Sequence, residues 1–245
     1  MNYTKWTKFL LKLSGEVFGN STFGPLSSPH LDRIARDISD MARDGQKWAI
    51  LTGGGNIQRG SVAAREGGNR ILHDQIGMLA TSINAIAFAN ALSKYGCSYQ
   101  IYNSVGITGV VEQFSAAGAK RAWDDGRVLV FGGGIGLPYF STDTAAALRA
   151  LEIGADVFLK GTKVPGIFDR DPCNASDSEA AIFYPWISYD DLIARNLKVI
   201  DMTAIALCRE NKLPVLVFNV MESGSLQKIF ENRSYQTVVS ERSIS

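Results

Sequence analysis

Three glycine-rich turns carry most of the groups in this sequence that could do chemistry. They are KLSGE at 12–16, GGGNIQRG at 53–60 and GGGIGLPYFSTD at 132–143. Each turn follows a short apolar run of the kind that forms a buried strand. Because a glycine turn leaves backbone N–H groups accessible to anions, all three turns are candidate phosphate-binding sites.

Cationic side chains accompany the first two turns. Lys12 can place a point charge on the β- and γ-phosphates of a nucleotide. The planar fork of Arg59 matches the oxygens of a phosphate. The alternative is an ordinary turn with a solvated cation, and for KLSGE both interpretations stay open. In the second turn, three consecutive glycines favour the phosphate site.

The third turn leads into a predicted helix. Ser141, Thr142 and Asp143 are residue types that favour a helix N-terminus. The partial positive charge of a helix N-terminus also attracts phosphate. These residues could therefore cap the helix, hold an anion, or do both.

Missing motifs argue against several other classes of protein. No segment reads G-x-x-x-x-G-K-[ST], so this is not a P-loop kinase, and no turn fits the dinucleotide-binding pattern G-x-G-x-x-G in register. There is no G-x-S-x-G elbow, and with 2 histidines and 3 scattered cysteines hydrolase chemistry and a zinc site have little support. The net charge of +1 favours neither nucleic acid nor a membrane surface as a partner.

Composition and hydropathy predict a globular protein of the cytoplasm. The chain is 46% hydrophobic and 20% charged, which is ordinary for a protein with a sizeable core. Its N-terminal apolar stretch is too short for a signal sequence, and no other segment is expected to approach the length of a membrane span. Three cysteines without a pairing pattern suit a reducing compartment.

Alternating strand and helix patterns position the three turns. Strands are predicted at 8–13, 48–51, 98–102, 127–131, 157–160, 215–218 and 237–239, and helices at 31–44, 74–95, 116–125, 143–153, 201–211 and 226–231. This alternation predicts an α/β fold whose mainly parallel sheet is covered on both faces. Ligands then bind beyond the carboxyl ends of the strands, where the glycine turns lie. The polar segment 172–181 is predicted to be a loop.

Six blocks of sequence, in order, resemble the bacterial uridylate kinases of the amino-acid kinase family. The resemblance covers nearly the whole chain, and the 69–81 block separates uridylate kinases from their relatives. It implies a three-layer α/β/α sandwich in one domain, with the UMP half roughly at 1–155 and the ATP half roughly at 156–245. The blocks are KLSGE (12–16), GGGNIQRG (53–60), NRILHDQIGMLAT (69–81), PYFSTD (138–143), LKGTKVPGIFDRDP (159–172) and LKVID (197–201).

The activity implied by the resemblance is transfer of the γ-phosphoryl group of ATP to UMP, in pyrimidine nucleotide biosynthesis. Lys12 and Arg59 would stabilise the developing charge, with Lys160 as a third candidate. Asp143 and Asp201 would orient lysines or a Mg²⁺-bound water, although Asp201 could equally be a helix cap. No compact set of metal ligands is visible, so Mg²⁺ is expected to arrive on the ATP phosphates.

The resemblance also assigns two nucleotide sites residue by residue. In the UMP site Asp74, expected to open the long helix, would accept a hydrogen bond from a ribose hydroxyl; alternatively it only stabilises the helix N-terminus. The expected UMP residues are Gly54, Asp74, Gly136, Pro138, Tyr139, Phe140, Ser141 and Thr142. The expected ATP residues are Lys12, Leu13, Ser14, Gly15, Gly55, Arg59, Thr162, Phe168 and Asp171.

The sequence departs from the family in the UMP loop and in segment 19–24. Ile135 and Leu137 stand where the family has threonine and asparagine, which removes two side-chain hydrogen bonds. Two other activities stay open: a related kinase of a carboxylate, carbamate or phosphonate, and a non-catalytic nucleotide sensor. Arg70 and Asp74 disfavour the first, and Lys12, Arg59 and Asp143 the second. The apolar helix at 74–95 is a candidate interface, and the resemblance suggests a homohexamer.

Overall fold

The computed structural model describes residues 6–19, 24–58, 68–170, 172, 181–231 and 236–242. Arg59 and Asp171 lie outside these residues. So do 173–180 of the predicted loop and 20–23 of the segment that departs from the family.

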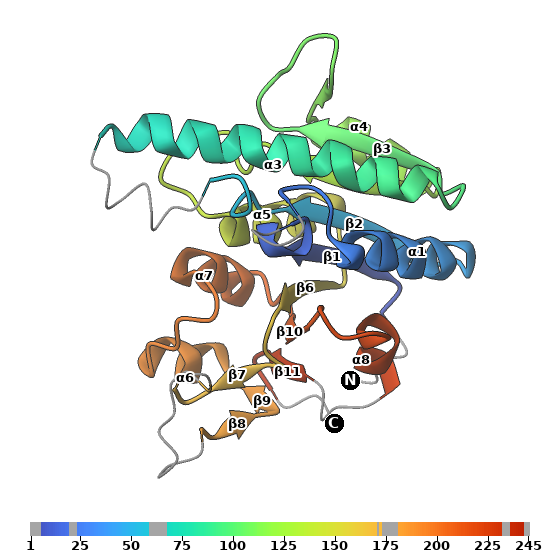
Figure 1. The fold of residues 1–245 in the computed structure, drawn as a ribbon. Coiled ribbons are helices and arrows are strands. Elements are labelled where there is room, and N and C mark those ends of the chain that lie inside the picture. Colours follow the sequence, from blue (N-terminus) through green and yellow to red (C-terminus); the bar gives the residue numbers. More distant parts are fainter. Residues whose placement is uncertain are drawn as a thin grey trace.

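A nine-stranded sheet runs through the middle of the described structure (Figure 1). Seven neighbouring strands are parallel, the next is antiparallel to them, and the last pairs in parallel with that one. In sheet order they are β4 (Glu112–Gln113), β3 (Tyr99–Asn103), β5 (Val128–Gly132), β2 (Lys47–Thr52), β1 (Lys8–Leu13), β6 (Val157–Thr162), β10 (Val215–Asn219), β11 (Gln236–Val239) and β9 (Trp186–Ile187).

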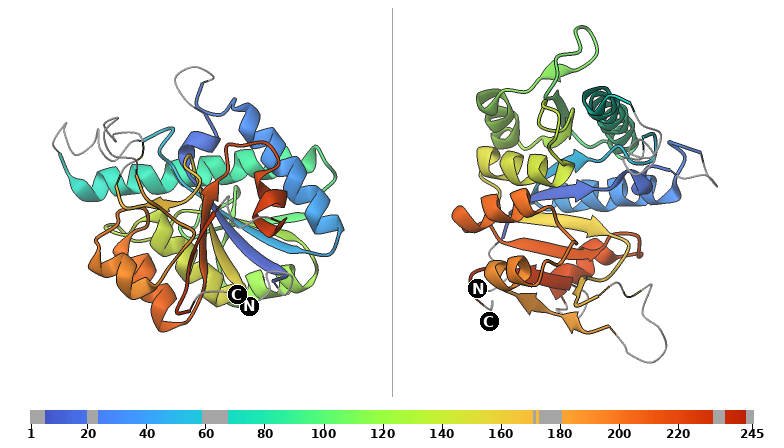
Figure 2. Two further views of the ribbon diagram at one scale, coloured as in Figure 1. Left: turned by 90° about the horizontal axis from the view of Figure 1, so that it is seen from below. Right: turned by 90° about the vertical axis from the view of Figure 1, so that its left-hand side faces the viewer.

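Helices cover both faces of this sheet, as the right-hand view of Figure 2 shows. One face carries α1 (Pro29–Arg43), α3 (Arg70–Ser93) and α8 (Ser225–Glu231). The other face carries α4 (Ala116–Asp124), α5 (Thr142–Ile153), α6 (Tyr189–Ala194) and α7 (Met202–Glu210). Each layer of helices packs on its own hydrophobic cluster. The predicted α/β/α sandwich around a mainly parallel sheet is therefore confirmed.

The central strand β1 shows how the sequence divides the two faces. Its side chains alternate because successive residues of a strand point to opposite faces. Phe9 and Leu11 join the cluster under α1 and α3, whereas Leu10 joins the cluster under α5. Lys12 continues the second series, so its side chain lies on the face covered by α5.

The long helix begins earlier than its sequence pattern indicated. Its N-cap is Asn69, whose side chain accepts a hydrogen bond from the backbone N–H of Ile71 at 2.9 Å. Asp74 lies one turn inside the helix, so the expectation that it opens the helix was wrong. The expectation about membrane spans also needs correction, because α3 is long and apolar enough to cross a membrane. Half of it is buried in the protein, as in a core helix.

Several short elements had no signal in the sequence. They include β4, β9, α6, the 3₁₀ helix η2 (Gly15–Val17) and the hairpin of β7 (Ile167–Phe168) and β8 (Phe183–Tyr184). A strand of two residues has no measurable period, so tertiary contacts alone define it.

Candidate active site

Two of the glycine turns interlock at the carboxyl ends of β1 and β2. The N–H of Gly53 donates to the carbonyl of Leu13 at 2.7 Å. Any side chain on Gly15 would collide with the other turn, because a Cβ there would lie 2.4 Å from the backbone nitrogen of Gly55. Among the described residues, no hydrogen bond uses the N–H groups of Gly54 or Gly55. These turns can therefore offer backbone donors to a phosphate.

Two lysines and one aspartate form a buried group beside these turns, which we call the lysine cluster (Lys12, Asp143 and Lys160). Lys12 and Lys160 are paired in register on adjacent parallel strands, so both side chains lie on the α5 face. Asp143, in the first turn of α5, contacts both: Lys12 Nζ lies 3.1 Å from Oδ1, and Lys160 Nζ contacts Oδ2. Two cations on one carboxylate leave a net positive charge.

The charges in the lysine cluster depend on each other. Burial alone would raise the pKa of Asp143, but the ammonium groups of Lys12 and Lys160 outweigh it and hold that pKa well below its usual range. Burial lowers the pKa of Lys160, and the carboxylate of Asp143 opposes this shift. The carbonyl of Val199 also accepts a hydrogen bond from Lys160 Nζ at 2.5 Å. Asp143 is thus anionic at neutral pH and orients both cations.

Asp201 joins the start of α7 to the start of α5. It is the N-cap residue of α7, but its side chain makes no capping hydrogen bond there. Instead its Oδ2 accepts hydrogen bonds from Ser141 Oγ at 3.0 Å and Thr144 Oγ1 at 2.5 Å. Ser141 in turn caps α5 by accepting from the N–H of Thr144 at 3.2 Å. Asp201 therefore fixes the end of the third glycine turn relative to α7.

A cavity of about 780 Å³ opens between α3 and the β5–α5 loop (133–141). Its lining brings together six of the eight expected UMP residues: Gly54, Asp74, Tyr139, Phe140, Ser141 and Thr142. Gly136 and Pro138 belong to the same loop but are not part of the lining. Ile135 and Leu137, the two departures from the family, do line the cavity. We call this space the main cavity.

Asp74 holds the β5–α5 loop, a role that its sequence context did not indicate. Its carboxylate accepts from the backbone N–H of Tyr139 at 2.8 Å and from Arg70 Nε at 2.9 Å. The Arg70 guanidinium also lies over the Tyr139 ring, 5.4 Å from its centroid. Tyr139 has a φ of 70°, in the left-handed region that non-glycine residues rarely adopt. Contacts from α3 thus hold this loop in a strained conformation.

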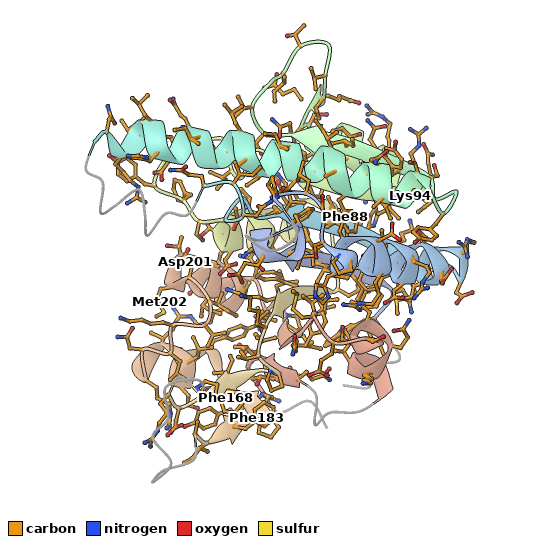
Figure 3. All side chains as sticks on the ribbon, in the orientation of Figure 1. Phe88, Lys94, Phe168, Phe183, Asp201 and Met202 are labelled. Carbon is orange, nitrogen blue, oxygen red and sulfur yellow. The ribbon has the colours of Figure 1, made fainter. Side chains whose placement is uncertain are left out.

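Of the expected ATP residues that the structure describes, Gly55 lines the main cavity together with Asp74, whereas the others are not part of its lining. Figure 3 shows Phe168 beside Phe183 in the β7–β8 hairpin, with ring centroids 5.3 Å apart. Thr162 ends β6, and its hydroxyl donates to the carbonyl of Val164 at 2.7 Å. Next to it, Lys163 Nζ lies 2.8 Å from a carboxylate oxygen of Glu16, which ties this segment to the KLSGE turn.

A second cavity, of about 360 Å³, borders the lysine cluster. Its lining includes Asp143, Lys160 and residues 198–202. Asp201 lines both this cavity and the main cavity. The lysine cluster therefore borders the second cavity and is linked to the main cavity through Asp201, whose backbone N–H donates to Asp143 Oδ2 at 3.4 Å.

Residues 7–219 match the amino acid kinase family. The chain belongs to this family. A uridylate kinase from Bartonella bacilliformis is 40% identical to it over 238 residues, which cover 97% of this chain and 98% of that protein. The family relationship thus extends over almost the whole chain.

Solved structures of two UMP kinases have the same architecture. The UMP kinase of Ureaplasma parvum has a TM-score of 0.89 at 33% identity and covers 97% of this chain and 100% of its own. The UMP kinase of Bacillus anthracis has a TM-score of 0.90 at 31% identity and covers 97% of each chain.

Proposed function

We propose that this member of the amino acid kinase family is a UMP kinase, which transfers the γ-phosphoryl group of ATP to UMP and gives ADP and UDP. The observation that carries the proposal is the lysine cluster, which Asp201 links to a main cavity lined by the α3 segment that resembles uridylate kinases. The names of the similar proteins support the choice of UMP. Pyrimidine nucleotide biosynthesis and a cytoplasmic location belong to the same proposal.

The proposed reaction needs alignment and charge stabilisation rather than a general base. A phosphate oxygen of UMP attacks the γ-phosphorus of ATP, and the bond to the β–γ bridging oxygen breaks as ADP leaves. The attacking oxygen is already anionic, so no proton has to be removed. Lys12 and Lys160 supply positive charge at the transferring group, and Asp143 keeps both ammonium groups aimed at it. Arg59 is proposed to add a further cation.

The main cavity suggests the position of UMP, and the resemblance to uridylate kinases suggests the position of ATP. UMP would occupy the main cavity, against Gly54, Asp74 and the β5–α5 loop. The ATP phosphates would lie on 12–15 and Gly55, and its adenosine near Thr162, Phe168 and Asp171. The proposed halves, roughly 1–155 and 156–245, meet at the lysine cluster, to which β1, α5 and β6 all contribute.

Mg²⁺ would supply further charge neutralisation on the phosphates when bound with ATP. Both oxygens of Asp143 are engaged by lysines, so this carboxylate is a poor metal ligand. Asp201 fits better, because its Oδ1 accepts no hydrogen bond from a described residue. We propose that Asp201 holds a Mg²⁺-bound water and that the ATP phosphates supply the remaining contacts.

A coupled assay with UMP, CMP, dCMP and TMP at fixed ATP and Mg²⁺ tests the proposed acceptor. We expect kcat/KM to be highest for UMP by a wide margin. Comparable values for CMP would remove the UMP-specific assignment and would point to Ile135 and Leu137 as the cause. Turnover only with carboxylate or carbamate acceptors would indicate a different kinase of the family. ATP binding without turnover of any acceptor would indicate a nucleotide sensor.

We also propose that the protein is a homo-oligomer, a hexamer by family resemblance, with α3 in an interface. Five large apolar side chains are exposed along one face of this helix, between 39% and 56%. They recur at alternating steps of four and three residues, which is the spacing of a helix–helix seam. The residues are Leu72, Ile76, Leu79, Ile83 and Ile86. Light scattering on the purified protein should give a multiple of the 26.6 kDa chain mass, and a monomer would contradict this.

A further inference from the structure

Helix α3 carries buried polar side chains that reach the glycine turns. Thr81 Oγ1 accepts a hydrogen bond from the N–H of Gly133 at 2.8 Å. Ser82 Oγ donates to Asn103 Oδ1 at 2.8 Å, and a Cβ on Gly132 would lie 2.7 Å from that same oxygen. The third glycine turn is thus packed against polar groups that α3 either carries or orients.

Asn84, three residues beyond Thr81, makes the equivalent connection to the second turn. Its side chain is fully buried. Its Nδ2 donates to the carbonyl of Gly53 at 2.6 Å and to Asn56 Oδ1 at 2.7 Å. Asn56 Nδ2 donates back to Asn84 Oδ1 at 3.0 Å and to the carbonyl of Pro25 at 2.6 Å. The two amides therefore fix both ends of the Gly53–Asn56 turn.

This turn is the one that interlocks with KLSGE. Gly53 N–H binds the carbonyl of Leu13, the residue after Lys12. A Cβ on Gly15 would meet Asn56 Oδ1 at 2.6 Å, so the amide pair touches the first turn as well. A shift of Asn84 would consequently move both turns that face the phosphates.

We propose that Asn84 is a positioning residue for phosphoryl transfer, whose side-chain amide holds the Gly53–Asn56 turn against the KLSGE turn. The inference rests on the proposed UMP kinase activity. Asn84 does not need to touch a nucleotide for this role, because it acts through the backbone of Gly53 and the amide of Asn56.

The consequence is kinetic. Displacing an aligned donor by about 1 Å can cost about a hundredfold in rate, so we expect loss of Asn84 to lower kcat by roughly 10- to 100-fold. The KM for UMP should change less than kcat, because only Gly54 and Gly55 of the main-cavity lining belong to this turn, whereas Thr81 and Asp74 support the β5–α5 loop independently. A purely structural role would lower the melting temperature and leave kcat intact.

The first test is Asn84→Leu, which keeps the branching of the side chain at Cγ, adds some bulk, and removes both the donor and the acceptor. Tyr189→Phe is the matched control, because it also removes one buried hydrogen bond to a carbonyl, that of Leu213. Tyr189 lies in α6, and Figure 1 shows α6 and α3 at opposite ends of the molecule. Both variants should melt at a lower temperature. Only Asn84→Leu should lose kcat.

The second test is Asn84→Asp, which keeps the size and shape of the side chain but replaces its NH2 donor with a carboxyl oxygen. An ionised carboxylate cannot donate to Gly53, whereas a protonated one can, and it still accepts from Asn56. Burial beside a carbonyl favours the protonated form of such a group. The ratio of its kcat to that of the wild type should therefore rise as pH falls. The same ratio for Asn84→Leu should stay flat.

The wild-type enzyme, assayed in parallel, separates the two hypotheses. Absence of UMP-dependent turnover in the wild type would refute the proposed function. It would also refute the role of Asn84, since there would be no phosphoryl transfer for it to support. If the wild type is active and folded Asn84→Leu keeps kcat within about twofold, where a positioning loss is roughly tenfold or more, Asn84 is not a positioning residue. If Asn84→Leu does not fold, Asn84→Asp decides on its own: a kcat within about twofold of the wild type at the pH values where the carboxylate is ionised overturns the proposal.

Discussion

The lysine cluster and the β5–α5 loop border the same region but are held in different ways. Lys12 and Lys160 extend from adjacent strands in register and are nine-tenths buried around one carboxylate. The loop depends on Tyr139, which is 67% exposed and whose strained backbone is held by Asp74 and Arg70. The lysine cluster is fixed by the sheet, whereas the middle of the loop is fixed by contacts at the surface.

Because the two regions are held differently, we expect each of them to control a different kinetic constant. Strand pairing places the cations whether or not an acceptor is bound, so the lysine cluster should act on the transferring group and affect kcat. The loop lines the main cavity, and its middle around Tyr139 rests on a few exposed contacts, which contribute little stability. Substitutions there should affect the affinity for UMP.

The largest effect is expected for Lys12→Ala. Removal of one cation from the transferring group should lower kcat on the order of a hundredfold or more, as loss of an oxyanion donor does in other enzymes. The KM for UMP should change little, because Lys12 does not line the main cavity. Steady-state kinetics with both substrates varied measures the two constants separately.

Lys163→Ala is the matched control for Lys12→Ala. This lysine lies at the same edge of the sheet, but it is 57% exposed and pairs only with Glu16 among the described residues. Its loss should change kcat by no more than about twofold, since exposed ion pairs contribute only about 0–1 kcal/mol. Equal losses of kcat in the two variants would mean that general positive charge matters, rather than the lysine cluster.

The sheet and its helices were largely predictable because their signals are local. The apolar run at 8–13 coincides with β1, and the stops at Gly45 and Gly154 come just after α1 and α5. The start of α3 was missed because the polar residues of its first turns hide the apolar period, and Asn69 is its cap. The β7–β8 hairpin was missed because two-residue strands have no period.

The candidate site was only partly predictable, for a related reason. Glycine turns are recognisable from their composition, and Lys12 was predicted as a site residue because it lies beside one of them. The meeting of Lys12, Lys160 and Asp143 depends on the pairing of β1 with β6, which no local pattern encodes. Asn84 gave no signal either, because one amide in a helix resembles a solvated side chain until the helix face that it occupies is known to be buried.

Asp74→Asn tests the loop region and should have the second largest effect. One charge-assisted acceptor is lost, at about 1.5–3 kcal/mol, so the KM for UMP should rise roughly tenfold to a hundredfold. The KM for ATP should change little. Because Asn69 caps α3, the effect cannot be attributed to the helix N-terminus. Isothermal titration with UMP, beside a melting curve, measures affinity and stability together.

Arg70→Gln separates the two roles that Asp74 can have. It removes the cation beside the carboxylate but keeps the carboxylate and its bond to the Tyr139 N–H. If Asp74 binds the ribose directly, this variant should retain much more affinity for UMP than Asp74→Asn. Equal losses would mean that Arg70 itself contributes to the site, either from the lining of the main cavity or through the Tyr139 ring. Unchanged affinity in Asp74→Asn would remove Asp74 from the site.

The smallest effect at neutral pH is expected for Lys160→Arg. This variant tests the lysine cluster through the pH dependence of kcat. Burial lowers the pKa of Lys160, so it loses its charge below the ordinary lysine value of about 10.4. The kcat of the wild type should therefore decline on the alkaline side below that pH. Arginine stays charged, so in Lys160→Arg the decline should move to higher pH.

Stability should follow the opposite trend over the same range of pH. Between the lowered pKa of folded Lys160 and the ordinary pKa of the unfolded chain, the unfolded state binds more protons. The contribution of Lys160 to the free energy of unfolding therefore rises with pH while kcat falls. Melting curves taken along the activity profile would distinguish this from alkaline unfolding, in which both decline together. An alkaline limb that stays in place in Lys160→Arg would assign the titration to another group.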